Sequence, residues 1–168
     1  MIEKHPFEPF VPQESRYLIL GSFPGRKSIQ EFPADDWYYG SKYNQFWKII
    51  ELVYAVNLPT RADKEALFAK LGIALSDIIL SCQRRVNTNA DSNLTNIIYN
   101  TAIVDEILAY HAIARILFTG KGVYYSFLKH FNLPENMPLT VLPSPSPAFA
   151  RMRIEAKALE YKKHLPEL

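Results

Sequence analysis

The sequence contains a single cysteine and no long hydrophobic run. Cys82 has no partner for an internal disulfide, and a lone thiolate excludes an iron–sulfur cluster held by several cysteines. The apolar runs are a handful of residues long, which is too short to cross a bilayer. The opening segment, MIEKHPFEPF, lacks the apolar region of a signal peptide. These features favour a cytoplasmic protein without a membrane segment.

Cofactor motifs and metal-ligand spacings are missing as well. The sequence has neither the G-x-G-x-x-G dinucleotide fingerprint nor the G-x-x-x-x-G-K-[ST] phosphate loop. The histidines, at positions 5, 111, 130 and 164, show no metal-ligand spacing. Cys82 lies near two arginines, but no histidine is close to it in the sequence, so an inert buried cysteine is the preferred interpretation. We therefore expect no metal and no cofactor.

Length and charge are consistent with one globular domain. A chain of 168 residues is long enough for one core and short for two, and a hydrophobic content of 48% is ordinary for a folded protein. We expect one domain spanning residues 1–168, and a monomer. The net charge is only +2, but residues 111–168 hold eight Lys and Arg against four Asp and Glu. This basic third is either a solvated helix face or a surface for a polyanion.

Short apolar runs alternate with helical patterns along the chain. Strand-like runs occupy residues 17–20, 77–81, 114–120 and 139–144, and helical patterns begin near Tyr43, Lys64, Lys121 and Arg151. This alternation predicts an α/β fold, a three-layer α/β/α sandwich around a four-stranded, mostly parallel sheet. Ligands of such sheets bind beyond the carboxyl ends of the strands. These ends are expected at residues 21–25, 81–85, 119–121 and 143–147.

Three segments near these ends have an unusual composition. The first, Gly21-Ser22-Phe23-Pro24-Gly25, is followed by two cations and a serine. The second has prolines at 143, 145 and 147, which force an extended backbone, with two serines between them. Such a segment is either a clamp that binds phosphates through its serines or a rigid connector. In the third, WYYGSKYNQFW, we expect Phe46 and Trp47 in the core and the two preceding tyrosines, Tyr38 and Tyr39, along a cleft where a base can stack.

The order and spacing of these motifs resemble the uracil-DNA glycosylase superfamily. The resemblance is closest to its hypoxanthine-DNA glycosylase branch, which shares G-S-F-P at residues 21–24, a Tyr-Tyr pair before Asn44, and L-P-S-x-S-P at residues 142–147. The first two motifs are also similar to the mismatch-specific uracil-DNA glycosylases. The segment LSDIILSCQRR is similar to the middle region of the hypoxanthine branch. Together these motifs cover residues 17 to about 151.

The resemblance implies a DNA repair enzyme that flips a damaged base out of the DNA and hydrolyses its N-glycosidic bond. It assigns the positioning of water to Asn44, because Phe23 stands where many relatives carry Asp or Asn. It implies a base pocket and a DNA-binding surface, without metal or cofactor. The implied pocket residues are Gly21, Ser22, Phe23, Pro24, Tyr39 and Ser81. The implied DNA-binding residues are Arg26, Lys27, Ser28, Ser144, Pro145, Ser146, Phe149 and Arg151, with Phe149 as a wedge in the vacated base stack.

The resemblance also implies a restricted substrate range. Efficient uracil enzymes of the family open the last motif with a histidine, whereas this chain has Leu142 there. We therefore expect activity on good leaving groups such as hypoxanthine, or on uracil in mispairs. Two alternatives stay open: a degenerate relative that binds nucleic acid without cleaving it, and an α/β enzyme that acts on small nucleotides or nucleosides.

Overall fold

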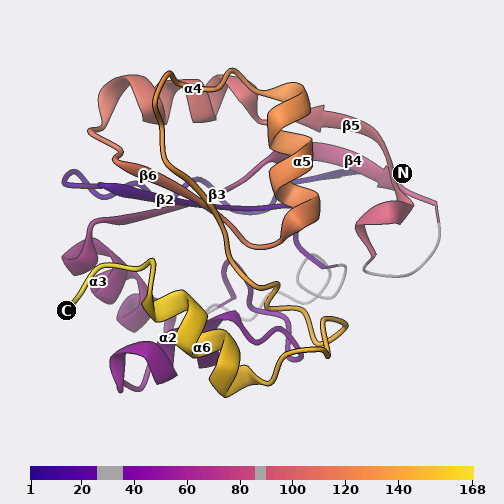
Figure 1. Ribbon diagram of the computed structural model, residues 1–168. Helices are drawn as coiled ribbons and strands as arrows, with labels where there is room; N and C mark the ends of the chain where they lie inside the picture. The colour runs from indigo at the N-terminus through magenta and orange to yellow at the C-terminus, as the bar shows by residue number, and fades with distance from the viewer. Residues whose placement is uncertain (26–35, 86–89) are drawn as a thin grey trace.

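The central sheet of the protein has four parallel strands. The computed structural model describes residues 1–25, 36–85 and 90–168 (Figure 1). The strands are β2 (Tyr17–Gly21), β3 (Ile73–Asp77), β6 (Arg115–Phe118) and β7 (Leu139–Val141), in the order β3-β2-β6-β7. Each neighbouring pair in this sheet is parallel. The predicted fold class is therefore confirmed.

Helices cover both faces of this sheet (Figure 1). One face carries α2 (Phe46–Tyr54), α3 (Arg61–Leu71) and α6 (Ile154–Lys162), and the other carries α4 (Thr101–Tyr110) and α5 (Lys121–His130). The central strand β2 supplies side chains to both layers. Ile19 packs into the core on the α2 side, whereas Leu18 and Leu20 pack into the core on the α4 side, and all three are fully buried. A strand covered on both faces is apolar along its length, which explains the run Leu-Ile-Leu.

The prediction for residues 77–81 was wrong in its boundaries. The strand of the parallel sheet is β3, which ends at Asp77, and the chain then bends at Ile78, whose N–H donates to the carbonyl oxygen of Gly21 at 2.8 Å. The following strand, β4 (Ile79–Arg84), belongs to a second sheet. The run IALSDIIL has no glycine or proline at the bend, and its apolar pattern continues on both sides, so this pattern alone cannot locate the change of sheet.

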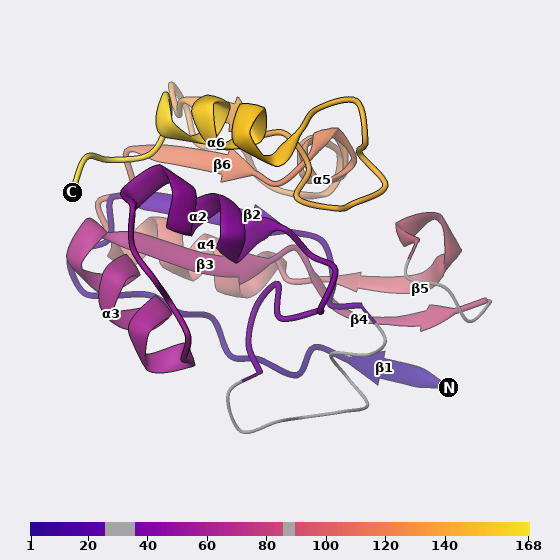
Figure 2. The same ribbon diagram turned by 90° about the horizontal axis from the view of Figure 1, so that it is seen from below.

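The second sheet was not predicted. It is antiparallel, with β4 between β1 (Ile2–Lys4) and β5 (Leu94–Tyr99), and it extends beyond the carboxyl end of the central sheet (Figure 2). Its strand β5 directly precedes α4 in the chain. The consequence for function is that the amino-terminal residues of the chain lie beside the end of β3.

The helices begin and end close to the predicted positions. Thr60 and Asp63 form a capping box at the start of α3, and Gly72 ends that helix with a φ of 65°, as its sequence position predicts. Helix α2 begins at Phe46 rather than at Tyr43, and α6 begins at Ile154 rather than near Arg151. Within the described residues, no helix combines the length and apolar character needed to span a bilayer.

Candidate active site

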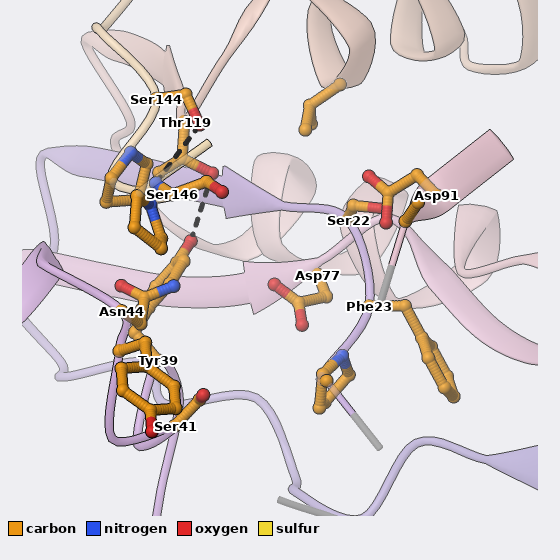
Figure 3. A pocket seen from close by; sticks show the side chains of 17 residues that line it. Ser22, Phe23, Tyr39, Ser41, Asn44, Asp77, Asp91, Thr119, Ser144 and Ser146 are labelled. Carbon is orange, nitrogen blue, oxygen red and sulfur yellow. Dashed lines mark hydrogen bonds between the residues drawn. The ribbon is translucent and has the colours of Figure 1, made fainter. Parts of the chain in front are cut away.

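A cavity of about 480 Å³ opens at the carboxyl end of the central sheet (Figure 3). Its walls come from the segments that follow β2, β6 and β7, from the end of β3, from the turn before α2, and from the 3-10 helix η1 (Asp91–Asn93). This volume falls within the range of about 300–1,000 Å³ that is usual for small-ligand sites. The location follows the general rule for ligand binding in parallel α/β sheets.

Most of the residues that the sequence selected meet at this cavity. Its lining includes Ser22, Phe23, Pro24, Tyr39, Asn44, Ser144, Pro145 and Ser146. Ser81 does not line it, because this residue is buried in β4, where it pairs with Lys4 and Ile98. Phe149 and Arg151 are exposed on the segment that follows the proline-rich loop. The predicted phosphate contacts Arg26, Lys27 and Ser28 lie outside the described residues.

Asn44 reaches the cavity from the turn that precedes α2. Its N–H donates to the carbonyl oxygen of Ser41 at 2.9 Å, and its side-chain Oδ1 accepts a hydrogen bond from the N–H of Phe46 at 2.9 Å. This local contact holds the side chain at the helix start. Because a carbonyl oxygen has two lone pairs, Oδ1 can still accept one hydrogen bond, and Nδ2 can donate. The side chain can therefore hold a water molecule at the cavity wall.

The Tyr39 ring forms part of the same wall as Asn44 (Figure 3). Its φ of 59° lies in the left-handed region, which a bulky aromatic residue rarely adopts, so the surrounding contacts must hold this backbone. The ring stacks on Phe46 with centroids 4.0 Å apart, and its Oη lies 3.4 Å from Thr119 Oγ1. Burial, followed by the nearby charge of Asp77, raises the pKa of Tyr39, so the phenol is neutral.

Tyr38 does not line the cavity, so that prediction was wrong. It is 2% exposed, and its ring packs against His5 and Phe7. Its backbone carbonyl oxygen accepts a hydrogen bond from Trp47 Nε1 at 2.7 Å, which ties the segment to α2. Two adjacent aromatics thus point in different directions, one into the core and one toward the cavity.

Gly21 lies directly behind the cavity at the end of β2. A Cβ added to Gly21 would overlap Asp77 Oδ1 and would lie 2.5 Å from Tyr39 Oη. The structure explains the glycine, because the protein's own side chains occupy the space that a Cβ would need. Gly21 itself, which the resemblance placed in the base pocket, is not among the lining residues.

Two carboxylates at the cavity were missed in the sequence. Asp77 is the last residue of β3, and Asp91 lies beside Ser22 on the opposite side of the cavity (Figure 3). Asp77 follows the rule that polar residues at strand carboxyl ends form sites, and the rule would have selected it had the strand been placed at residues 73–77. Among the described residues, no group of three His, Cys, Asp or Glu side chains is arranged to hold a metal ion.

The proline-rich loop is fastened to both neighbouring helices. The N–H of Gln45 donates to the carbonyl oxygen of Pro145 at 2.9 Å. Lys157 Nζ, on α6, donates to Gln45 Oε1 at 2.8 Å and to the carbonyl oxygen of Ser146 at 3.2 Å. Lys157 is only 1% exposed, and burial lowers the pKa of its ammonium group. The Lys157 Nζ group therefore lies under the loop that carries the two rim serines.

Replacement of Lys157 tests whether this fastening matters. Lys157→Met preserves a long side chain but leaves Gln45 Oε1 and the Ser146 carbonyl oxygen without their donor. We expect the free energy of unfolding to fall by about 1–3 kcal/mol. Urea denaturation measures this effect. Lys162→Met, an exposed position on the same helix, is the matched control, and equal unfolding midpoints for the two variants would contradict the expectation.

Comparisons with known proteins bear on the fold and the family of this chain. The model of the Uracil DNA glycosylase superfamily matches residues 8–167. Among solved structures, the solution NMR structure of a "putative Uracil DNA glycosylase" from Methanosarcina acetivorans has a TM-score of 0.68 at 23% identity, covering 98% of this chain and 96% of that chain. At this identity the likeness establishes the fold. The comparison with curated proteins finds no match. Because the family model spans nearly all of its residues, the chain belongs to the uracil DNA glycosylase superfamily.

Proposed function

We propose that this protein is a monomeric DNA glycosylase that removes a deaminated base by hydrolysis of its N-glycosidic bond, with hypoxanthine preferred over uracil in mispairs. The observation that carries the proposal is the meeting of Asn44, the Tyr39 ring and the Ser144–Ser146 loop at one cavity, in a chain of this superfamily. Asn44 can hold a water molecule, the Tyr39 ring can stack on a base, and the Ser144–Ser146 loop can bind the phosphate backbone.

In this proposal, the flipped nucleotide enters the cavity base first. The base stacks on Tyr39, while the loop that carries Ser144 and Ser146 contacts the phosphates at the rim. Asn44 orients the water that attacks the anomeric carbon as the bond to the base breaks and an oxocarbenium-like sugar develops. Phe149, 37% exposed, inserts into the vacated stack, and Arg151 contacts a neighbouring phosphate.

The proposed preference for hypoxanthine rests on Leu142, which stands where the efficient uracil enzymes of the family carry a histidine. Leu142 is 1% exposed and belongs to the core on the α2 side, so it supplies no hydrogen-bond donor to a departing base. The reaction then depends on bases that leave readily. Hypoxanthine meets this condition, and mispaired uracil also flips at a lower cost than a paired base.

A cleavage panel tests the proposed function. Duplex oligonucleotides, each with one hypoxanthine, uracil or normal base, are incubated with the protein and then treated with alkali to cut at abasic sites. We expect strand scission at hypoxanthine, weaker scission at uracil opposite guanine, and none at normal bases. DNA binding without any scission would instead indicate a non-catalytic relative, and turnover of free nucleosides without salt-dependent DNA binding would indicate a small-nucleotide enzyme.

The Tyr39 ring is expected to act through stacking and not through its hydroxyl. Stacking on an aromatic ring is worth roughly 1–3 kcal/mol per base, so Tyr39→Ala should slow hypoxanthine release by about 10- to 100-fold. Tyr39→Phe should stay close to the parent, because the distance of 3.4 Å to Thr119 Oγ1 makes for a weak hydrogen bond. Single-turnover rates of the two variants decide whether the ring or the hydroxyl acts. Tyr110 is 81% exposed on α4, so Tyr110→Ala is the control. A Phe variant as slow as the Ala variant would assign the role to the hydroxyl.

A further inference from the structure

An exposed aromatic residue lies at the mouth of the cavity. Tyr43 is 62% exposed and lines the cavity directly before Asn44 in the chain. The neighbouring residues Ser41 and Asn44 lie on the same cavity wall as Tyr39 (Figure 3). Within the described part of the chain, neither a hydrogen bond nor another aromatic ring holds the Tyr43 side chain. A tyrosine ring in this situation is suited to binding a ligand, because it offers a large apolar face and its burial breaks no hydrogen bond.

The backbone around Tyr43 is fixed by hydrogen bonds. The Asn44 N–H donates to the carbonyl oxygen of Ser41 at 2.9 Å, which makes Lys42 and Tyr43 the two central residues of a turn. The residue after Asn44 donates its N–H to the carbonyl oxygen of Pro145, also at 2.9 Å. Lys42 is exposed, and its Nζ lies 5.8 Å from the centroid of the Tyr43 ring. The turn therefore presents a ring and a positive charge beside the proline-rich loop.

Phe149, the aromatic residue on the other side of this loop, has only one open face. Lys157 Nζ lies over its ring, 5.4 Å from the centroid. The same Nζ donates hydrogen bonds to Gln45 Oε1 and to the carbonyl oxygen of Ser146, which keep it in this position. A ring with a cation on one face can stack on a base only through the other face.

A flipped nucleotide leaves two neighbours at the mouth of the cavity. It stays joined to both through its phosphates, so both must lie at the rim. Each neighbour loses the base on which it was stacked, and a protein ring that replaces this contact offsets part of the cost of flipping. The open face of Phe149 can serve one neighbour. The Tyr43 ring, on the turn that is bonded to the same loop, is placed to serve the other.

Resting on the proposed function, we propose that Tyr43 is a second DNA-stacking residue, which holds one neighbour of the flipped nucleotide while Phe149 holds the other. The Tyr43 ring stacks on the base of that neighbour, and Lys42 contacts a phosphate beside it. Aromatic rings with nearby cations bind unpaired nucleotides without reading their sequence, because every base has a face that can stack. The contact therefore adds affinity whichever base lies next to the lesion.

A substrate that lacks one neighbouring base tests this contact directly. Three duplexes each carry one hypoxanthine: in the first both neighbours are intact, in the second the 5′ neighbour is a baseless sugar, and in the third the 3′ neighbour is. A 2′-fluoro group on the hypoxanthine nucleotide destabilises the sugar cation and so blocks cleavage during the titration. Fluorescence anisotropy gives the Kd of each duplex for the parent, Tyr43→Ser, Tyr43→Phe and Phe149→Ala. Tyr110→Ser is the matched control, because Tyr110 is 81% exposed at the end of α4 that precedes β6, away from the cavity.

We expect Tyr43→Ser to weaken binding of the intact duplex by about 5- to 100-fold, the value of one stacked base. Tyr43→Phe and Tyr110→Ser should bind like the parent. On one of the two baseless duplexes, Tyr43→Ser and the parent should bind equally, because the stacking partner is already gone, while on the other the loss should remain. Phe149→Ala should show the opposite assignment of the two duplexes.

Three results would overturn the inference. Parent-like affinity of Tyr43→Ser for the intact duplex would mean that the ring does not contact DNA. Equal losses on all three duplexes would mean that it does not contact a neighbouring base. Loss of the effect on the same duplex for Tyr43→Ser and Phe149→Ala would mean that the two rings do not divide the neighbours between them.

The salt dependence of binding tests Lys42. Lys42→Gln should lower the slope of log Kd against log salt concentration by about one, the value of one phosphate contact. Lys70→Gln, at an exposed position at the end of α3 that precedes β3, should leave the slope unchanged. An unchanged slope in Lys42→Gln would contradict the phosphate contact.

The unmodified hypoxanthine duplex separates this inference from the proposed function. A parent protein that binds the duplexes but never releases hypoxanthine would overturn the proposed function, and the Kd values would still decide the role of Tyr43. A parent protein that releases hypoxanthine, with Kd values unaffected by Tyr43→Ser, would overturn the inference alone. Absence of any DNA binding would overturn both.

Discussion

Asn44→Ala is expected to slow the release of hypoxanthine in single turnovers by about 100- to 10,000-fold while DNA affinity changes little. The size of the loss follows from the proposed role, since the amide orients the attacking water, and a group that acts mainly in the transition state affects the chemical step more than binding. In the proposed binding mode DNA affinity depends on the rim loop and its neighbours, and within the described residues the Asn44 side chain makes no hydrogen bond to that loop. Rapid-quench rates and a fluorescence titration of the same oligonucleotide separate the two quantities.

Two companion variants distinguish chemistry from folding. Asn44→Ala also removes the acceptor for the Phe46 N–H, which destabilises the start of α2 by about 1 kcal/mol. Asn44→Asp keeps this acceptor and a lone pair for water, so it should fold like the parent and retain base release. Asn57→Ala, at an exposed position beyond the other end of α2, controls for the loss of an amide elsewhere. Turnover by Asn44→Ala equal to that of the parent would remove Asn44 from the mechanism.

Gly21→Ala is expected to reduce base release by about 100-fold, because it moves two cavity groups at once. The added methyl would overlap Asp77 Oδ1 and approach Tyr39 Oη to 2.5 Å, so both side chains must shift. A misplacement of about 1 Å can cost about 100-fold in rate. The free energy of unfolding should also fall by about 1–3 kcal/mol, as expected for overpacking of a closely packed interior.

The control and the rescue for Gly21 come from the same chain. A Cβ added to Gly122, on α5, meets no atom within 4 Å beyond its chain neighbours and the backbone of its own helix, so Gly122→Ala should leave rate and stability close to the parent values. Adding Tyr39→Phe to Gly21→Ala removes the oxygen nearest the new methyl and should restore part of the lost rate. Single-turnover rates and urea midpoints of the parent, Gly21→Ala, Gly122→Ala and the double variant test this packing. Parent-like behaviour of Gly21→Ala would contradict the close approach of Tyr39 and Asp77 to the strand.

The sequence by itself determined the parallel α/β sandwich and most of the cavity lining. Buried parallel strands appear as continuous apolar runs, and the loops that follow them contain the unusual residues, so local pattern was sufficient to find Asn44, Tyr39 and the rim serines. These features depend on residues adjacent in the chain, and the role of Asn44 came from the resemblance of its motif to the family. Spacing and composition carry such information directly.

Only the tertiary structure decided which distant side chains complete the site. Asp77 lines the cavity and Ser81 does not, because the chain bends at Ile78 between two sheets, and no glycine or proline marks that bend. His5 contacts Asp77 across 72 positions of sequence, and Lys157 contacts Gln45 across 112. Contacts of this kind arise from how sheets and helices pack, and packing depends on the summed burial of the whole core, which leaves no periodic signal around any one of these residues.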